Sequence, residues 1–457
     1  MAALTSTGLC KWGEVQSSTF SPIYYLGCKR EFTPAIKAAI DEVDPSGGRL
    51  GDLFAGTGAV GAFLGASREV TTVDVQEYSR VLCSAVLKPQ RMSSHEIRKL
   101  IASLKNSEKV QRIQWCLEPL IDYEQHCIAS AQYGDYAGLI ELLESHPLAA
   151  RETILERQHS RFNDAANRVI ERLKEYAVWD SPDTTVSRLF GGVYFSFEQA
   201  VMLDAMLTRA NSSDFAMRDT LIAATLSTAS MLVNTVGKQF AQPLRPKSKS
   251  GVVKTGLASV VQRDRSMNAL ATYELWLRRY LTLLPAVGEA RALREGYLDA
   301  ISKHGPSWSV LYADPPYTRD HYSRFYHVLE TMCLRDNPAF SLVTKSGEVE
   351  ISRGLYRQDR HQSEFCIRSS APAAFSALFQ NARKSNLPLV LSYSPHETGD
   401  GTHPRVVSMN LILEIATQHY ERVEVSNIDG STHNLLNRSG LKLKTRAHAE
   451  ILLKCYR

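Results

Sequence analysis

The stretch Leu50-Gly-Asp-Leu-Phe-Ala-Gly-Thr-Gly58 decides the fold class of this chain. Apolar residues run through Asp52 into a turn that contains Gly56 and Gly58, and Ala59–Leu64 then has the composition of a helix. Glycine permits a tight turn and a close approach of the backbone to a ligand. The order of strand, glycine turn and helix is typical of the first unit of an α/β sheet. A Gly-x-Gly pair alone is weak evidence, because many such turns use glycine only for packing.

The next apolar stretch supplies a candidate ligand for the same sheet edge. Residues 69–75 read as a second strand, and Asp74 lies at its end, roughly 20 residues after the glycine turn. An α/β sheet places a carboxylate at this distance to bind ribose hydroxyls. The alternative role for Asp74 is to cap the helix that follows.

A second informative stretch, Asp314-Pro-Pro-Tyr317, follows the apolar run Trp308–Ala313. A carboxylate can accept a hydrogen bond from an amine, and proline offers only a carbonyl acceptor because it lacks an N–H. The tyrosine ring can stack on a flat base. A rigid turn after a strand is the structural alternative. Ligands of open α/β sheets bind beyond the carboxyl ends of the strands, so we expect this stretch and the glycine turn to share one edge.

Together these stretches resemble the S-adenosylmethionine-dependent DNA adenine-N6 methyltransferases. The likeness is greatest to the Dam-like alpha class, in which the cofactor motifs precede the catalytic motif. Five further segments resemble the same family: Tyr24–Arg30, Tyr322–Glu330, Gly354–Arg357, Leu389–Ser394 and Ala449–Lys454. The resemblance covers roughly residues 21–84 and 301–457 and is fainter between them.

The resemblance implies a doubly wound, Rossmann-like sheet with an inserted, mostly helical target-recognition domain. The catalytic domain is expected at residues 1–90 and 301–457, and the insertion at residues 91–300. Apolar residues at helical spacing within the insertion support this division: Phe162, Ala166, Val169, Leu173 and Tyr176. The sequence leaves open whether part of residues 185–240 belongs to the catalytic core.

The family likeness also implies a reaction and a set of site residues. The reaction is methyl transfer from S-adenosylmethionine to the exocyclic amine of a flipped adenine. Asp314 and the carbonyl of Pro315 would accept hydrogen bonds from the amine, and Tyr317 would stack on the base. The expected catalytic residues are Asp314, Pro315, Pro316 and Tyr317. The expected cofactor-binding residues are Tyr25, Lys29, Asp52, Phe54, Gly56, Gly58, Asp74 and Asp314.

Basic residues gather in one loop-like part of the insertion. The chain carries a net charge of +5, which alone does not identify a partner. Residues 236–265 contain seven Lys or Arg and one acid, separated by glycine, serine and proline. Such a loop either follows a phosphate backbone or is a solvated surface. Beside methyltransferase motifs we expect contact with double-stranded DNA through Lys238, Arg245, Lys247, Lys249, Lys254 and, near the catalytic stretch, Arg319.

Composition excludes other classes of protein. We expect no membrane span or secretion signal, because no apolar run is long enough. Eight scattered cysteines without a Cys-x-x-Cys pair argue against zinc and for reduced thiols in a cytoplasm. His327 and Glu330 lack a third metal ligand nearby and read as a polar helix face, so we expect no metal.

Two alternatives to DNA adenine methylation stay open from sequence. The same pocket could act on adenine in RNA, or the chain could be a non-catalytic DNA-binding protein that keeps the fold. The target sequence, the oligomeric state and the presence of a cognate restriction endonuclease or defence-system partner cannot be read from the residues.

Overall fold

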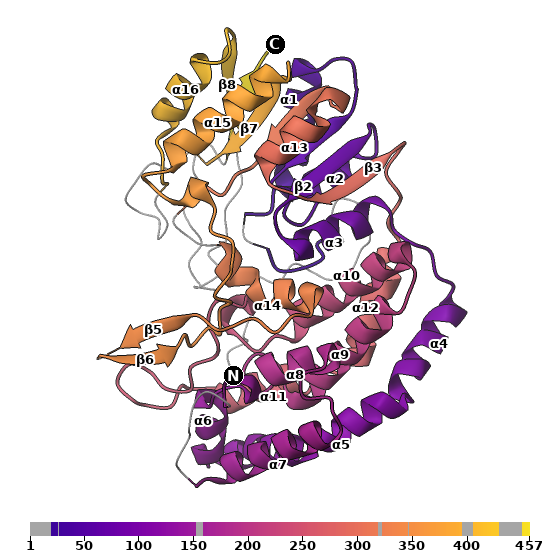
Figure 1. Ribbon diagram of the computed structural model, residues 1–457, viewed down its shortest axis with the longest axis vertical. Helices are drawn as coiled ribbons and strands as arrows, with labels where there is room; N and C mark the ends of the chain where they lie inside the picture. The colour runs from indigo at the N-terminus through magenta and orange to yellow at the C-terminus, as the bar shows by residue number, and fades with distance from the viewer. Residues whose placement is uncertain are drawn as a thin grey trace, which may run out of the picture.

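The computed structural model describes residues 20–25, 27–151, 159–318, 322–345, 347–394, 405–428 and 450–457. Figure 1 shows a sheet lobe, to which early and late segments of the sequence both contribute, above a lobe built almost entirely of helices. The chain leaves the sheet lobe after α3 (Glu77–Leu87) and re-enters it at β3 (Ala290–Arg294). In the described residues, no helix combines the length and the apolar character that crossing a bilayer requires.

One sheet of seven strands, counted over the described residues, organises the first lobe in the order β3-β2-β1-β4-β7-β9-β8. The strands β1, β2, β3, β4 and β7 run parallel, and β9 pairs antiparallel with both β7 and β8. The sheet thus has the Rossmann-like, doubly wound order that the sequence predicted, with its switch point between β1 and β4. The other strand bounds are β1 Leu50–Leu53, β2 Val70–Asp74, β4 Val310–Ala313, β7 Leu389–Tyr393, β8 Val423–Ile428 and β9 Glu450–Cys455.

Helices cover both faces of the sheet, so its central strands are apolar on both sides. In β4, Val310 and Tyr312 pack with α1, whereas Leu311 and Ala313 pack with α15. Alternate residues of one strand point to opposite faces, and burial of both faces selects the continuous apolar runs seen in the sequence. One face carries α1 (Thr33–Val43), α2 (Ala59–Leu64) and α3, and the other carries α13 (Tyr297–His304), α15 (Ala371–Lys384) and α16 (Met409–Thr417).

The helical lobe contains the long helices that periodicity predicted. Its central helix, α10, packs against α9 and α12 within the lobe and against α3 of the sheet lobe, so this part of residues 185–240 joins the two lobes. Beside it lies α14 (Tyr322–Leu334), which follows the catalytic stretch in sequence. A short hairpin, β5 (Leu342–Lys345) with β6 (Glu348–Ile351), projects from this region (Figure 1). The lobe's other bounds are α4 Ser94–Lys105, α5 Glu108–Gln132, α6 Ala137–Glu144, α7 Arg161–Glu175, α8 Thr185–Phe190, α9 Phe197–Asn211, α10 Phe215–Leu232, α11 Leu257–Arg265 and α12 Ala269–Tyr280.

The predicted end of the insertion at residue 300 lies inside the sheet lobe. Strand β3 pairs with β2 in parallel, from Ala290 opposite Val70 to Arg294 opposite Asp74. Because β3 is an edge strand, only Ala290 is fully buried, and Arg291 and Arg294 are exposed. An edge strand with two arginines lacks the apolar run by which buried strands are recognised.

The polar helix face of His327 and Glu330 is buried, which the sequence did not indicate. The Glu330 carboxylate accepts hydrogen bonds from the backbone N–H groups of Glu77 (3.1 Å) and Tyr78 (3.0 Å), where it caps α3. His327 Nε2 lies 3.2 Å from the carbonyl oxygen of Phe240. In the described residues, no group of three potential ligands is arranged to hold a metal ion.

A buried ion pair ties the helical lobe together. Arg265 forms a salt bridge with Glu124 of α5, and both side chains are almost fully buried. The Arg265 guanidinium also donates to Asn234 Oδ1 and to the carbonyl of Gly192. Arg265 therefore belongs to the core of the lobe, although the sequence places it within the basic stretch.

We expect Arg265→Met to lower the free energy of unfolding by about 3–5 kcal/mol, because it leaves the Glu124 carboxylate buried without its cation. Arg263→Met is the matched control: the Arg263 side chain is 66% exposed, and its bond to Asp264 should contribute less than about 1 kcal/mol. Urea denaturation followed by circular dichroism measures both. Equal stability of the two variants would contradict this account of the lobe.

Candidate active site

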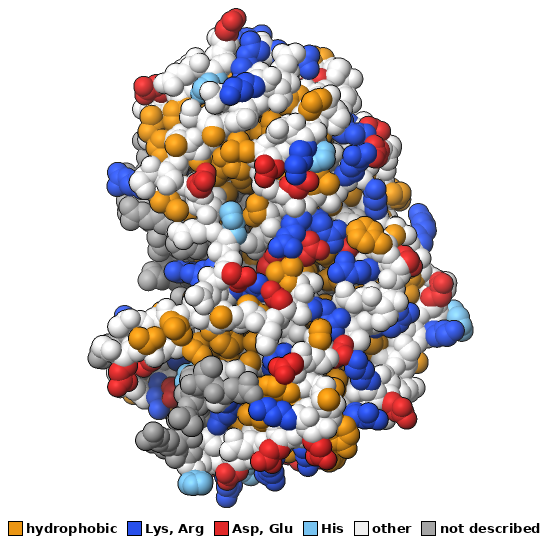
Figure 2. All heavy atoms as spheres, viewed as in Figure 1, with side chains coloured by type: hydrophobic (Ala, Val, Ile, Leu, Met, Phe, Trp, Pro, Cys, Tyr) orange, Lys and Arg blue, Asp and Glu red, His pale blue; other side chains and the backbone are white. Residues whose placement is uncertain are grey.

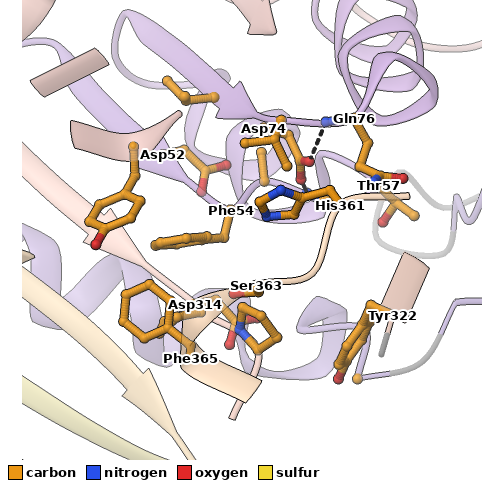
Figure 3. A pocket seen from close by; sticks show the side chains of 18 of the residues that line it. Asp52, Phe54, Thr57, Asp74, Gln76, Asp314, Tyr322, His361, Ser363 and Phe365 are labelled. Atoms are coloured by element: carbon orange, nitrogen blue, oxygen red, sulfur yellow. Dashed lines mark hydrogen bonds between the residues drawn. The ribbon is translucent and has the colours of Figure 1, made fainter. Parts of the chain in front are cut away.

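A cavity of about 460 Å³ lies at the carboxyl ends of β1, β2 and β4. The pairing of β1 with β4 aligns Leu53 with Ala313, so the glycine turn and the Asp-Pro-Pro-Tyr stretch leave the sheet side by side. Figure 3 shows Asp52 and Asp74 on one side of the cavity and Asp314 on the other, with Phe54 and His361 between them. The two stretches that the sequence singled out therefore share one cavity.

The glycine turn has a tightly constrained backbone. Phe54 and Gly56 both have positive φ angles, 59° and 56°. The N–H of Gly56 donates to Asp74 Oδ2 at 3.0 Å, and its carbonyl accepts from Ser79 Oγ at 2.6 Å. A phenylalanine in the left-handed region is strained, and such residues cluster at functional sites. The bonds to Asp74 and Ser79 hold the turn in place and keep its backbone at the cavity wall.

Gly58 has a different role from Gly56. Its φ is 75° and it forms the N-cap of α2, so it shapes the turn. A Cβ atom at this position would lie 3.0 Å from Val86 Cγ2 and 3.1 Å from Cys83 Sγ, both on α3. The missing side chain of Gly58 thus allows close packing against α3, and its role in cofactor binding stays a prediction. Gly56 does line the cavity, opposite the ring of Tyr25.

Asp52 brings an unsatisfied acceptor to the cavity. Its side chain is 1% exposed, and Oδ2 has no hydrogen-bond partner among the described residues. Burial raises the pKa of Asp52 to about 8, and the nearby Asp314 adds to the rise. A buried carboxylate without a partner is costly, so its position favours a ligand that carries a donor or a positive charge.

Aromatic rings form the apolar part of the cavity wall. Phe54 lies edge-to-face with Phe365, at 5.3 Å between ring centroids, and contacts Tyr297 at the same distance. Tyr25 stacks on Tyr326 at 4.9 Å. Such a lining suits a flat, apolar group. The carboxylates of Asp52, Asp74 and Asp314 in the same cavity can orient a ligand by hydrogen bonds.

The centre of the site is a buried group of charges around Lys29. Lys29 Nζ lies 3.2 Å from Asp314 Oδ1 and 3.1 Å from Glu450 Oε2, and Tyr317 Oη is 3.4 Å away. Burial opposes the charge of the ammonium, but Asp314 and Glu450 together raise the pKa of Lys29 well above its usual value. Burial raises the pKa of Asp314 to about 7, because Lys29 only partly offsets the desolvation and Glu450 adds to it.

The rest of the catalytic stretch is held in place by neighbouring segments. Pro315, Pro316 and Tyr317 line the cavity next to Asp314. The Tyr317 ring lies against Tyr393 at 5.1 Å, and its carbonyl accepts from the N–H of Val406 at 3.0 Å. The stretch is therefore fixed from the side of β7.

Some residues in and behind the cavity wall carry no motif that assigns them to the site. Glu450, which lies behind Lys29, is recognisable from sequence only as part of the closing strand. The segment His361–Cys366 lines the cavity but carries no recognisable motif. Burial lowers the pKa of His361, and the neighbouring Asp74 opposes this shift. Tyr322, which also lines the cavity, lies in one of the family-like segments.

The expected DNA-contacting residues fall into three groups. Arg245, Lys247 and Lys249 are exposed on the loop before α11, and Lys254 is half-buried. Lys238 is a correction: its ammonium bonds to the carbonyls of Met231 and Val233 and to Asp264, so it holds the loop and is not free to bind phosphate. Arg319 lies outside the described residues. On the face of the molecule drawn in Figure 2, Lys and Arg side chains are intermingled with Asp and Glu.

We expect Asp52→Asn to stabilise the ligand-free protein by about 2 kcal/mol or more at pH 8. The folded-state pKa lies above the unfolded value, so the ionised carboxylate destabilises the fold as pH rises from 4 to 8, and the gain should vanish near pH 4. Thermal melting across this pH range measures it.

Asp44→Asn is the control with the opposite sign. Burial of Asp44 is outweighed by hydrogen bonds from Ser46 and Ser309, which lower its pKa, so this variant should lose stability above pH 4. A destabilised Asp52→Asn protein at pH 8 would contradict the proposed cost of the buried acid.

Comparison with known families identifies the first part of this site. Residues 25–114 match the D12 class N6 adenine-specific DNA methyltransferase family. The matched segment contains Tyr25, Lys29, the glycine turn and Asp74, and it ends before the Asp314 stretch. No curated protein matches the chain. This match over residues 25–114 supports the resemblance of the chain to the Dam-like adenine methyltransferases.

Proposed function

We propose that this protein methylates the N6 amine of an adenine at a specific DNA site, with S-adenosylmethionine as methyl donor. One observation carries the proposal: Asp314 faces the glycine turn across a cavity that both segments line. The family match supports DNA adenine methylation in general. The cofactor, the flipped base and the residue roles below are parts of the proposal.

The residues on the β1 and β2 side of the cavity suit S-adenosylmethionine. The unpartnered Oδ2 of Asp52 suits the amino group of the methionine part, and Asp74 at the end of β2 suits the ribose hydroxyls. Phe54 and Phe365 offer ring surfaces to the adenosine part, and Gly56 allows close approach. The bound cofactor would supply an electrophilic methyl group on a sulfonium.

The residues on the β4 side suit an adenine amine. The amine lone pair is delocalised into the ring, so the amine is a poor nucleophile. An Asp314 oxygen would accept one N–H and the Pro315 carbonyl the other, which favours a tetrahedral nitrogen and stabilises the positive charge that develops on it. The methylated amine is acidic and can release its proton after transfer. Tyr317 is the proposed stacking surface for the ring.

The substrate base must leave its duplex to reach this cavity. An amine inside the helix cannot line up with a methyl group held at the sheet edge, so we propose that the base is flipped out. The helical lobe, with Arg245, Lys247, Lys249 and Lys254 on its loop, is the proposed target-recognition region. We propose that this activity takes place in the cytoplasm.

We expect Asp314→Asn to lower the methylation rate at least about 100-fold, because it removes the charge that stabilises the reacting amine. Cofactor binding by calorimetry should change little. The control is Asp299→Asn, an exposed acid of α13 that lines the same cavity, which should keep its rate. Methylation of plasmid DNA is read by modified-base sequencing, with RNA as a second substrate. A rate near that of the wild type would reject Asp314, and activity on RNA alone would replace the proposed substrate.

The combined variant Lys247→Gln, Lys249→Gln and Lys254→Gln should bind DNA more weakly, because each lysine that neutralises a phosphate releases counterions. The slope of log affinity against log salt should fall by about 0.9 for each phosphate that is no longer neutralised. Neutralisation of Arg98, Lys99 and Lys105, exposed on α4 at the other flank in Figure 1, is the matched control. An unchanged slope in the loop variant would exclude the loop from the DNA interface.

A further inference from the structure

Glu450 is an unexpected second acid in the charge group around Lys29. It is the first residue of β9, the strand that closes the described chain, and its side chain is fully buried. Oε2 lies 3.1 Å from Lys29 Nζ, and Oε1 accepts from Ser392 Oγ at 3.3 Å. Neither the glycine turn nor the Asp314 stretch includes it, and β9 reaches the site only through its pairing with β7.

The geometry around Lys29 is nearly symmetric. Its ammonium is 3.2 Å from Asp314 and 3.1 Å from Glu450; the Glu450 side chain is fully buried, and that of Asp314 is 21% exposed. A lysine that faced Asp314 alone would neutralise it and make it a weaker acceptor for a substrate amine. A second carboxylate at equal distance divides the charge of the ammonium between two partners. When both acids are ionised, the group of three carries a net negative charge.

We propose that Glu450 is a positioning residue for methyl transfer: it holds Lys29 between two acids, so that ionised Asp314 stays a strong acceptor for the amine. The inference rests on the proposed function. It assigns a role in the chemistry to the closing strand, which lies far from both motifs in sequence.

The surrounding groups determine how this arrangement responds to pH. Besides Lys29 and Asp314, the hydroxyls of Tyr317 and Tyr312 face the charge group, and Ser392 bonds to Glu450. Glu450 raises the pKa of Asp314, and Lys29 lowers it. Loss of the Glu450 charge should therefore move the titration of Asp314 to lower pH. A purely structural Glu450 predicts no such shift.

The test compares Glu450→Gln, which keeps shape and a hydrogen-bond acceptor but removes the charge, with Glu450→Asp, which keeps the charge on a shorter side chain. Lys454→Met is the matched control, because Lys454 lies on the same strand and pairs with Glu42 and Glu424 away from the cavity. The methylation rate at saturating substrate is measured against pH, and cofactor affinity is measured by calorimetry.

We expect Glu450→Gln to lower the plateau of the rate about 10-fold or more and to move its acid limb to lower pH, while cofactor affinity stays within about 3-fold. Glu450→Asp should keep the wild-type acid limb with an intermediate plateau. Lys454→Met should match the wild type in both. A Glu450→Gln profile equal to the wild type, or a lower plateau with an unmoved limb, would overturn the proposal. If Glu450→Gln does not fold, a full wild-type plateau in Glu450→Asp would overturn it.

A second measurement separates this inference from the proposed function. The carboxyl carbon of Asp314, assigned by its loss in Asp314→Asn, can be titrated by carbon NMR whether or not the protein methylates DNA. A lower midpoint in Glu450→Gln than in the wild type is expected, and equal midpoints would contradict the role of Glu450. A wild-type protein that methylates neither DNA nor RNA would instead refute the proposed function.

Discussion

The parallel pairing of β1 with β4 is the constraint on which the site depends. Its register sets Leu53 opposite Ala313, so residues that follow each strand emerge together at the switch point of the sheet. The sequence between the two strands forms β2, β3 and the helical lobe, and none of it intervenes between the partners. Burial on both faces by α1 and α15 fixes β4, and with it Asp314, against the turn at Gly56.

The site combines three acidic side chains with the ammonium of Lys29. Asp52, Asp314 and Glu450 are largely shielded from water, and Lys29 contacts two of them. Burying these acids costs free energy, and the fold holds them in place before a ligand binds. Such preorganisation is what a reaction that develops positive charge on an amine requires, since little rearrangement is then needed as the charge forms. The cationic cofactor proposed here would relieve part of the repulsion on the side of Asp52.

The sequence predicted the features that depend on local pattern. A buried strand followed by glycine or by Asp-Pro-Pro-Tyr is readable because both elements are contiguous, and the periodicity of α7 revealed the helical lobe. Contacts set by tertiary pairing were not readable. Glu450 lies next to Lys29 because β9 pairs with β7 in the sheet. That Lys238 holds its loop in place follows from its bonds to backbone carbonyls, which the sequence does not reveal. The direction of Gly58 toward α3 likewise follows from helix packing, not from the motif.

The most direct measurement is a crystal structure with S-adenosylhomocysteine and a duplex that carries the methylated site. The account predicts an extruded adenine with N6 within hydrogen-bond distance of an Asp314 oxygen and its ring beside Tyr317. The product of the cofactor should lie against Gly56, with its amino group at Asp52 Oδ2. An adenine that stays stacked in the duplex, or a cofactor product bound outside the cavity between β1 and β4, would contradict the account.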